Sequence, residues 1–267
     1  MKKRITIHLR RKLPARTYGL LAGTSVGVIV ILWALASYSG AVSSLFLPTP
    51  SAVAASAAAL VQEPAFAKDI WMSVSRIVMG AILSMVIAIP LGIYIGVNKH
   101  VEALFDPIIS FIRYVPASAF VPLFILWFGI GEAQKVFFIF AAVAPYLVVL
   151  VTDAVSSVKK ELTEAALTLG AGHSDVIRRV IIPSSLPAIW DAVRLMTSWA
   201  WAFVVFAEVV AATSGLGYLI VTSQRFLRTS DVLVVIFVIG FLGLVTEYLF
   251  RISYRQFFPW AEKTRHA

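Results

Sequence analysis

The sequence predicts an all-α protein that crosses a membrane about six times, and three observations carry this prediction. Of the 267 residues, 60% are hydrophobic and only 14% are charged, whereas soluble domains are about 45–50% apolar and about 25% charged. The mean hydropathy is +0.88, so the apolar excess must face lipid. Long intervals of the chain also lack Asp, Glu, Lys and Arg, as expected because an ionised group at bilayer depth costs about 3 kcal/mol or more.

These charge-free intervals place the spans. A helix needs about 20 mostly apolar residues to cross the roughly 30 Å of hydrocarbon. On that scale, spans are expected near residues 18–38, 72–97, 107–130, 133–152, 192–212 and 230–250. The interval after Arg16 is too long for one span. Its second half, Leu47 to Leu60, opens on Leu-Pro-Thr-Pro-Ser and becomes rich in Ala and Ser, which favours a turn and an external helix over a seventh span.

The basic residues are distributed unevenly about these spans. If the N-terminus is cytoplasmic, 16 of the 23 Lys and Arg residues fall on the cytoplasmic side, in accord with the positive-inside rule. We therefore expect a cytoplasmic basic tail over residues 1–17, a transmembrane domain over 18–250 with a cytoplasmic loop at 153–190, and a cytoplasmic C-terminal tail over 251–267. No small-residue cleavage site ends the first apolar run, so we do not expect a cleaved signal peptide.

No pattern in the sequence indicates catalysis. The absence of Cys excludes thiolate nucleophiles, disulfides and Cys-based metal sites. No Gly-Lys dipeptide is present, so a P-loop for ATP is absent. The four His residues are isolated, with no spacing typical of a metal site. We expect no catalytic residue, metal or cofactor in this chain. The net charge of +9 follows from topology, and a nucleic-acid role is not supported.

The polar loop between spans four and five is the most informative segment, because loops of such length usually have a function. Glu164-Ala-Ala166 favours a short helix that ends at Gly170-Ala-Gly172, and a second short helix is expected to stop at Pro183. Two short helices joined at a glycine corner would stand out of the membrane and offer a surface to another protein.

This loop resembles the cytoplasmic motif of the permease subunits of bacterial ABC importers that work with a binding protein. The motif reads Glu-Ala-Ala, three residues, Gly, nine residues, Ile, one residue, Leu-Pro. With Val in place of Ile and Ile in place of Leu as conservative departures, the matching positions are Glu164, Ala165, Ala166, Gly170, Val180, Ile182 and Pro183.

The resemblance covers about residues 45–250 and extends to the branch that handles nitrate, sulfonates and taurine. The segments similar to that branch are Leu47-Pro-Thr-Pro-Ser51, Ser73-x-x-Arg76, Pro116 to Glu132, Leu169-Gly-Ala171, and Glu208 followed by Ser214-Gly-Leu-Gly-Tyr218. The loop motif is specific for the superfamily, whereas the substrate branch is less sharply marked.

The resemblance implies a permease of the type I importer fold in the bacterial inner membrane. It implies a homodimer, two cytoplasmic ABC ATPase subunits and an extracytoplasmic solute-binding protein, with ATP and Mg used by the ATPase subunits alone. Residues Glu164 to Ala171 would seat in the ATPase cleft, and alternating access would move a small anion such as nitrate, a sulfonate or taurine. Related permeases also serve aromatic acids and pyrimidine precursors, so the substrate stays open.

Residues within or beside the spans are candidates for a pathway or gate: Arg76, Pro116, Pro122, Glu208, Gly215 and Gly217. Glu208 and Arg76 are expected at similar depth near the outer surface, either as an ion pair that serves packing or gating, or in contact with solute. Pro116 and Pro122 each remove a backbone hydrogen bond and would interrupt span three. The two glycines permit a tight external turn before a short helix.

Two other classes of membrane protein compete with an importer permease. A self-contained secondary transporter or channel should show inverted repeats and titratable groups at the midplane, and the sequence shows neither clearly. A scaffold without transport activity would not need Gly- and Pro-interrupted spans or the protruding loop. The sequence therefore favours the importer permease.

Overall fold

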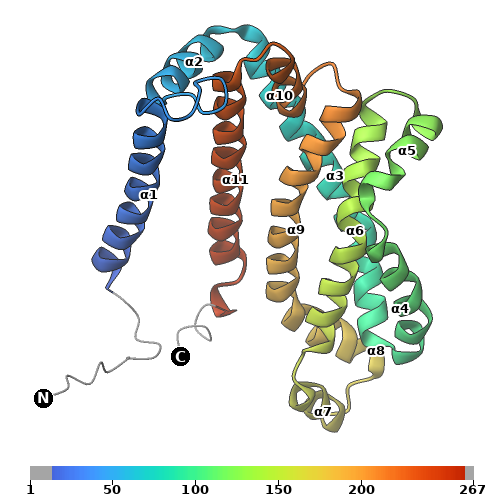
Figure 1. Cartoon of the computed structure of the whole chain (residues 1–267). Coiled ribbons are helices and arrows are strands. Elements are labelled where there is room, and N and C mark those ends of the chain that lie inside the picture. The colour runs from blue at the N-terminus through green and yellow to red at the C-terminus, as the bar shows by residue number, and fades with distance from the viewer. Residues whose placement is uncertain (1–13, 262–267) are drawn as a thin grey trace, which may run out of the picture.

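The computed structural model describes residues 14–261, and every regular element within them is helical (Figure 1). The elements in chain order are α1 (Ala15–Tyr38), α2 (Pro50–Gln62), α3 (Pro64–Val97), α4 (Lys99–Tyr114), the 3₁₀ turn η1 (Ala117–Phe120), α5 (Val121–Phe128), α6 (Glu132–Ser156), α7 (Lys160–Thr168), α8 (His173–Val176), the π turn η2 (Ile177–Ile181), α9 (Ile182–Ala211), α10 (Leu216–Arg225) and α11 (Thr229–Phe257). Most of the predicted basic tail lies outside the described residues.

Within residues 14–261, five helices are long and apolar enough to cross a membrane: Arg16–Tyr38, Pro64–Val97, Glu132–Ser156, His173–Val210 and Thr229–Phe257. The predicted spans 18–38, 72–97, 133–152 and 230–250 each lie within one of them, so their existence is confirmed. A sixth crossing is available if the bent pair α4 and η1–α5 counts as one span.

The predicted span 107–130 is interrupted at Pro116, as expected, but the second interruption expected at Pro122 is wrong. The helices Lys99–Tyr114 and Ala117–Phe128 meet at an angle of 86°. Val115 and Pro116 between them are extended, with ψ of 123° and 125°. A residue before proline is driven out of the helical region, and proline itself has no amide hydrogen to donate. Pro122 does not interrupt a helix, because it lies in the first turn of α5, where no intrahelical donor is needed.

The expected helix stop at Pro183 is also wrong. The chain from His173 to Val210 is one continuous helix, so the second short helix of the polar loop is the first part of span five. The π turn Ile177–Ile181 widens the helix just before Pro183, which occupies the first turn of the α9 segment. A widened turn can accommodate a residue without an amide donor.

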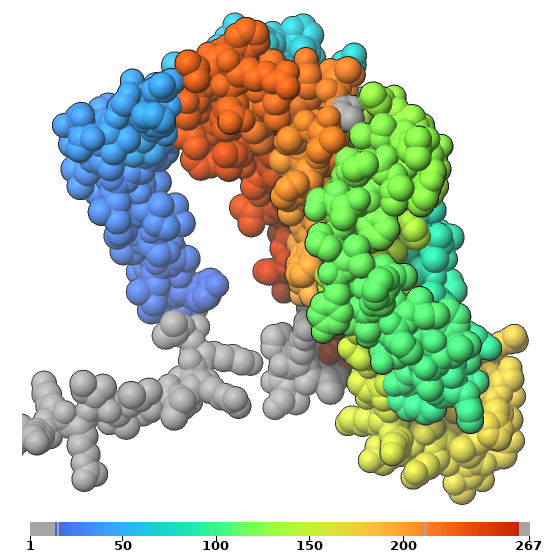
Figure 2. Space-filling view, turned by 45° about the vertical axis from the view of Figure 1, so that its right-hand side comes forward, coloured from blue at the N-terminus to red at the C-terminus, as the bar shows by residue number. Residues whose placement is uncertain are grey.

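A short helix, α2, is confirmed where the external helix was expected. The Thr49 hydroxyl caps its start by accepting from the Ala52 amide at 3.3 Å, and its 13 residues reach about 20 Å, too short for a seventh span. In Figure 1, α2 and α10 lie at one end of the bundle, while α7, the beginning of α1 and the end of α11 lie at the other. Figure 2 shows α1 standing apart from the rest of the bundle below α2.

The core forms where α3 packs on α6, and α9 packs against both of these helices. A Cβ on Gly92 would lie 2.7 Å from Val151 Cβ and 2.8 Å from the Val148 carbonyl oxygen, so only glycine allows this approach. Val151 itself is 0% exposed. The tight contact holds α3 and α6 rigidly, and both helices carry residues of the polar cluster described next.

Candidate functional site

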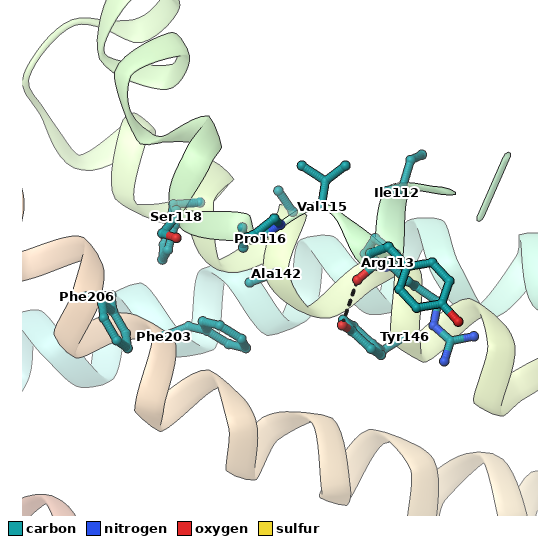
Figure 3. A pocket seen from close by; sticks show the side chains of 14 residues that line it. Ile112, Arg113, Val115, Pro116, Ser118, Ala142, Tyr146, Phe203 and Phe206 are labelled. Carbon is teal, nitrogen blue, oxygen red and sulfur yellow. Dashed lines mark hydrogen bonds between the residues drawn. The ribbon is translucent and has the colours of Figure 1, made fainter. Parts of the chain in front are cut away.

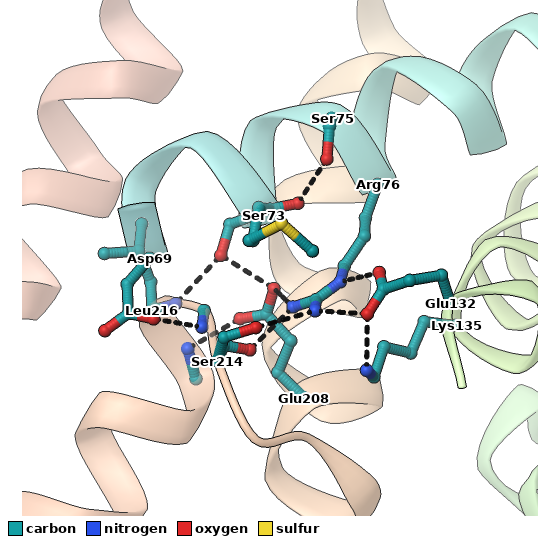
Figure 4. A network of polar contacts seen from close by, with 12 residues as sticks. Asp69, Ser73, Ser75, Arg76, Glu132, Lys135, Glu208, Ser214 and Leu216 are labelled. Atoms are coloured by element: carbon teal, nitrogen blue, oxygen red, sulfur yellow. Dashed lines mark hydrogen bonds and ion pairs between the residues drawn. The ribbon is translucent and has the colours of Figure 1, made fainter. Parts of the chain in front are cut away.

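Arg76 is the centre of a buried charge cluster at the end of the bundle that carries α10 (Figure 4). Its side chain is 0% exposed. Its Nε and Nη2 donate to the two carboxylate oxygens of Glu132 at 2.6 and 2.7 Å. Its Nη1 donates to Glu208 Oε1 at 2.7 Å and to the Ser214 carbonyl at 2.8 Å, and Nη2 also donates to Ser214 Oγ at 3.3 Å. A guanidinium has five N–H groups, and these contacts engage all of them.

Glu208 is equally enclosed, with a side chain that is 0% exposed. Its Oε1 accepts from Ser73 Oγ at 2.7 Å and from Arg76, while Oε2 accepts from the Gly217 amide at 2.7 Å. Every partner is a donor, so the site is built for the charged carboxylate. The expected pairing of Glu208 with Arg76 is therefore confirmed.

Glu132 and Lys135, at the start of α6, complete the cluster. The Lys135 ammonium is almost fully buried and donates to Glu132 Oε1 at 2.9 Å. Glu132 alone is open, with a side chain that is 44% exposed. Arg76 and Lys135 balance Glu132 and Glu208, so the four groups carry no net formal charge. Buried charges are tolerated in such paired, hydrogen-bonded sets.

The same cluster fastens the segment that leads into α10. The amides of Gly215, Leu216 and Gly217 donate in turn to Asp69 Oδ1, Ser73 Oγ and Glu208 Oε2, at 2.8, 2.8 and 2.7 Å. These amides are unsatisfied donors at a helix start, and side chains of α3 and α9 satisfy them. Gly215 has a φ of 115°, and a Cβ there would lie 2.5 Å from Arg76 Nη1. The predicted glycine turn is thus confirmed, with a role in close approach to the ion pair.

The sequence reasoning missed Asp69, Glu132 and Lys135 as members of this cluster. A signal for Asp69 existed, because Asp69, Ser73 and Arg76 are spaced by four and three residues and so share one face of α3. No comparable signal pointed to Glu132, which reaches Arg76 only because α6 packs along α3. Among residues 14–261, no group of three His, Cys, Asp or Glu side chains is arranged to hold a metal.

A second feature is a cavity of about 360 Å³ at the bend between α4 and η1 (Figure 3). Its lining is Ile112 to Ser118 from the bend, Phe138, Ala141, Ala142, Pro145 and Tyr146 from α6, and Phe203 and Phe206 from α9. Because the helix breaks at Pro116, the Arg113 carbonyl has no helical donor. The Tyr146 hydroxyl donates to it at 2.9 Å, as a broken span within a membrane requires.

The residues predicted for ATPase coupling lie at the end of the bundle opposite the charge cluster. Glu164 and Ala165 are exposed and Ala166 half-buried on α7, and Gly170 ends this helix with a φ of 86°. Ala171 follows, its amide donating to the Ala166 carbonyl at 3.0 Å. Val180 and Ile182 are half-buried and Pro183 is exposed in the first turns of the helix that becomes span five. The motif thus brackets the corner between α7 and that helix.

Long apolar helices and one broken span beside a cavity are features of an integral membrane protein, and transport proteins commonly contain such broken helices. The chain belongs to the family of binding-protein-dependent transport system inner membrane components, whose model matches residues 88–262. It is accordingly a permease component of the inner membrane, and its relatives in the family are permease subunits rather than enzymes.

Named relatives are similar over most of their length. The taurine transport system permease protein TauC of Escherichia coli is 33% identical over 92% of this chain and 91% of its own. SsuC of Bacillus subtilis, named for transport of aliphatic sulfonates, is 30% identical over 94% of this chain and 92% of its own length. The bicarbonate transport system permease protein CmpB of Synechococcus elongatus is 25% identical over 66% of this chain and 63% of its own length.

Solved structures share the fold. A chain of the MetNI methionine ABC transporter, in an inward facing conformation, superposes with a TM-score of 0.66 over 72% of this chain and 95% of that one, at 18% identity. A chain of an amino acid ABC transporter with histidines superposes with a TM-score of 0.57, also at 18% identity. The predicted type I importer permease fold is confirmed.

Proposed function

We propose that this chain moves a small oxyanion-bearing solute across the inner membrane by alternating access, driven by ATP hydrolysis in separate ABC ATPase subunits. Family membership supports the permease role. The solutes named for the relatives TauC, SsuC and CmpB are taurine, aliphatic sulfonates and bicarbonate, each of which bears a sulfonate or carbonate group. Nitrate, the other anion expected from the sequence, shares the planar arrangement of three oxygens with bicarbonate.

The observation that carries the ATP-driven mechanism is the exposed helix α7. No residue of α7 is buried, and Leu162, Leu167 and Leu169 are 47, 45 and 89% exposed. Exposed leucines beside charged residues on a short protruding helix are typical of a protein-docking surface. We propose that Glu164 to Ala171 seat in the ATPase cleft, and that Val180, Ile182 and Pro183 transmit the movement to span five.

The remaining partners follow from the same proposal. Large apolar side chains of α4 and α5, among them Phe111, Leu126 and Trp127, are 71, 78 and 62% exposed, which supports a second copy of the chain packed along this side. A solute-binding protein would dock at the α2 and α10 end, with both termini and α7 in the cytoplasm. ATP and Mg would be bound by the ATPase subunits.

Within this mechanism we assign the Arg76 cluster to packing and not to solute contact. Every N–H of Arg76 is engaged within the chain, and no oxygen of Glu208 is without a partner. The cluster ties α3, α6, α9 and α10 into one unit. That unit would move as a rigid body when the pathway opens outward.

The test of the proposed coupling uses two glycines at one corner. Gly170→Val forces a β-branched residue into a φ of 86°, which costs roughly 1–2 kcal/mol and shifts the corner. Gly172→Val is the matched control, because Gly172 has an ordinary φ of −73°. We expect Gly170→Val to reach the membrane but to lose its ABC ATPase on affinity purification from native membranes, while Gly172→Val retains it.

Quantitative mass spectrometry of the purified material measures the ATPase. An ATPase retained by Gly170→Val at the wild-type ratio, with normal solute uptake, would contradict the coupling assignment. Absence of any ABC ATPase from the wild-type preparation would contradict the proposed function as a whole.

A further inference from the structure

Arg113 is the arginine of the broken span, and its charge is unpaired. It forms no ion pair with a carboxylate in the described part of the chain, and its Nε is buried without a hydrogen-bond partner. The arginines of α3 and α9 differ: Arg76 pairs with Glu132 and Glu208, and Arg194 lies 3.5 Å from Asp191 and 3.4 Å from Glu247. The half-buried guanidinium of Arg113 therefore has the partial negative charge of the end of α4 beside it but no carboxylate as a counter-ion.

The depth of Arg113 makes this charge costly. Its partner Tyr146 lies ten residues before Ser156, the end of α6, so it sits about 15 Å from that end and about 20 Å from the other. Arg113 thus lies near the middle of the bundle, where an ionised side chain without a counter-ion costs several kcal/mol. An unpaired arginine at such a depth beside a cavity indicates a place for an anion.

The surroundings hold the guanidinium in place without neutralising it. Arg113 Cζ lies 5.2 Å from the ring centroid of Tyr146, and the Tyr146 ring is 5.6 Å from that of Trp199. A cation over an aromatic face is stabilised but keeps its charge and its donors. Arg113 and Tyr146 lie at one side of the cavity and Phe203 and Phe206 at the other (Figure 3).

The cavity has the size and the polarity of a ligand site. Its volume of about 360 Å³ falls within the roughly 300–1,000 Å³ of small-molecule pockets, which combine apolar walls with a few placed polar groups. Ser118 of η1 also lines the cavity, and its hydroxyl group can donate a hydrogen bond. An oxyanion such as a sulfonate can accept two parallel hydrogen bonds from an arginine fork, while the two phenylalanines face its organic part.

We propose that this cavity is a solute subsite, in which Arg113 binds the oxyanion group of the passing solute and excludes cations. The inference rests on the proposed function, which it deepens by naming the residue that selects for negative charge. In this proposal, Arg113 at the bend of the broken span selects for negative charge, and the buried Arg76 cluster lies outside the pathway.

The test exploits the absence of cysteine from the sequence. Ser118→Cys gives the full chain a single thiol in the cavity lining, and Ala117→Cys gives a second, independent one. In nanodiscs, each thiol is labelled with a methanethiosulfonate that carries a sulfonate or a trimethylammonium group, and the two labelling rates are compared. We expect Arg113→Gln to lower the ratio of the sulfonate rate to the cation rate roughly a hundredfold. One charge acting over about 10 Å at an effective dielectric constant near 20 changes each rate by about tenfold, and the two rates change in opposite directions.

Two controls isolate the charge of Arg113. Arg113→Lys keeps the charge and should keep the ratio, and Arg225→Gln removes an exposed arginine elsewhere and should leave it unchanged. Taurine or nitrate should slow labelling of the thiol in the parent chain and not in Arg113→Gln. A ratio unaffected by Arg113→Gln, a lack of protection by both anions, or a lack of labelling at both cysteines would each overturn the proposal.

These measurements do not require transport, so the two proposals fail separately. Charge-selective labelling in a chain that imports no anion would support the subsite and contradict the proposed function. Conversely, normal taurine or nitrate uptake by Arg113→Gln would retain the function and overturn the subsite.

Discussion

Removing both partners of the Arg76–Glu208 pair should cost less than the sum of the two single removals. Arg76→Gln deletes five hydrogen bonds and leaves the fully buried Glu208 carboxylate without its cation, a change that typically costs about 3–5 kcal/mol. Glu208→Gln introduces an amide NH₂ group where every neighbour is a donor. One unsatisfied polar contact of that kind costs about 1–3 kcal/mol.

The double variant Arg76→Gln, Glu208→Gln leaves Glu132 paired with Lys135 at 2.9 Å and removes both charges of the fully buried ion pair. Its loss of unfolding free energy should be smaller than the sum of the two single losses by about 1–3 kcal/mol, the range for directly contacting groups. The unfolding free energy of each purified variant is measured by SDS titration in mixed micelles, with Arg225→Gln, an exposed site, as the control.

Strict additivity of the two changes would refute the pairing argument. The assignment of the cluster to packing would be refuted if Glu208→Gln kept the unfolding free energy of the wild type but lost solute uptake. A carboxylate that faces the pathway affects transport and not stability. Wild-type stability and uptake in all three variants would reject both roles.

Three further predictions concern the turn, the bend and the topology. Gly215→Ala should lower the unfolding free energy by more than about 2 kcal/mol, because the new Cβ would lie 2.5 Å from Arg76 Nη1 at a φ of 115°. Gly243→Ala is the control and should be neutral in the same SDS titration, because a Cβ there has nothing within 4 Å. Equal effects of the two substitutions would contradict the close-approach argument. Tyr146→Phe removes the donor to the Arg113 carbonyl and should cost about 0.5–1.5 kcal/mol, and a loss below measurement error would mean that water replaces the hydroxyl. Reporter fusions after residue 160 and at the C-terminus should report the cytoplasm and one after residue 62 the outside, and a cytoplasmic signal at residue 62 would overturn the orientation.

The sequence alone determined the class of protein, the existence of its long apolar helices, the break at Pro116 and the short helix α2. These features follow from local composition, because the cost of an ionised group in hydrocarbon and the length of a helix are read along the chain without knowledge of its partners. The Glu164 to Pro183 motif likewise depends on spacing. Its residues could therefore be placed at one corner in advance, although the helix stop expected at Pro183 was wrong.

The tertiary structure alone decided the surroundings of the charged residues. The pairing of Glu208 with Arg76 was predicted as one of two alternatives, but Glu132 lies 56 residues from Arg76 and joins it only through the packing of α3 on α6. The unpaired state of Arg113 was equally hidden, because it depends on which carboxylates the fold brings near. Sequence spacing records neighbours within one helix, whereas the electrostatic environment of a buried charge is set by side chains from several helices, whose approach depends on side-chain volume at contacts such as Gly92.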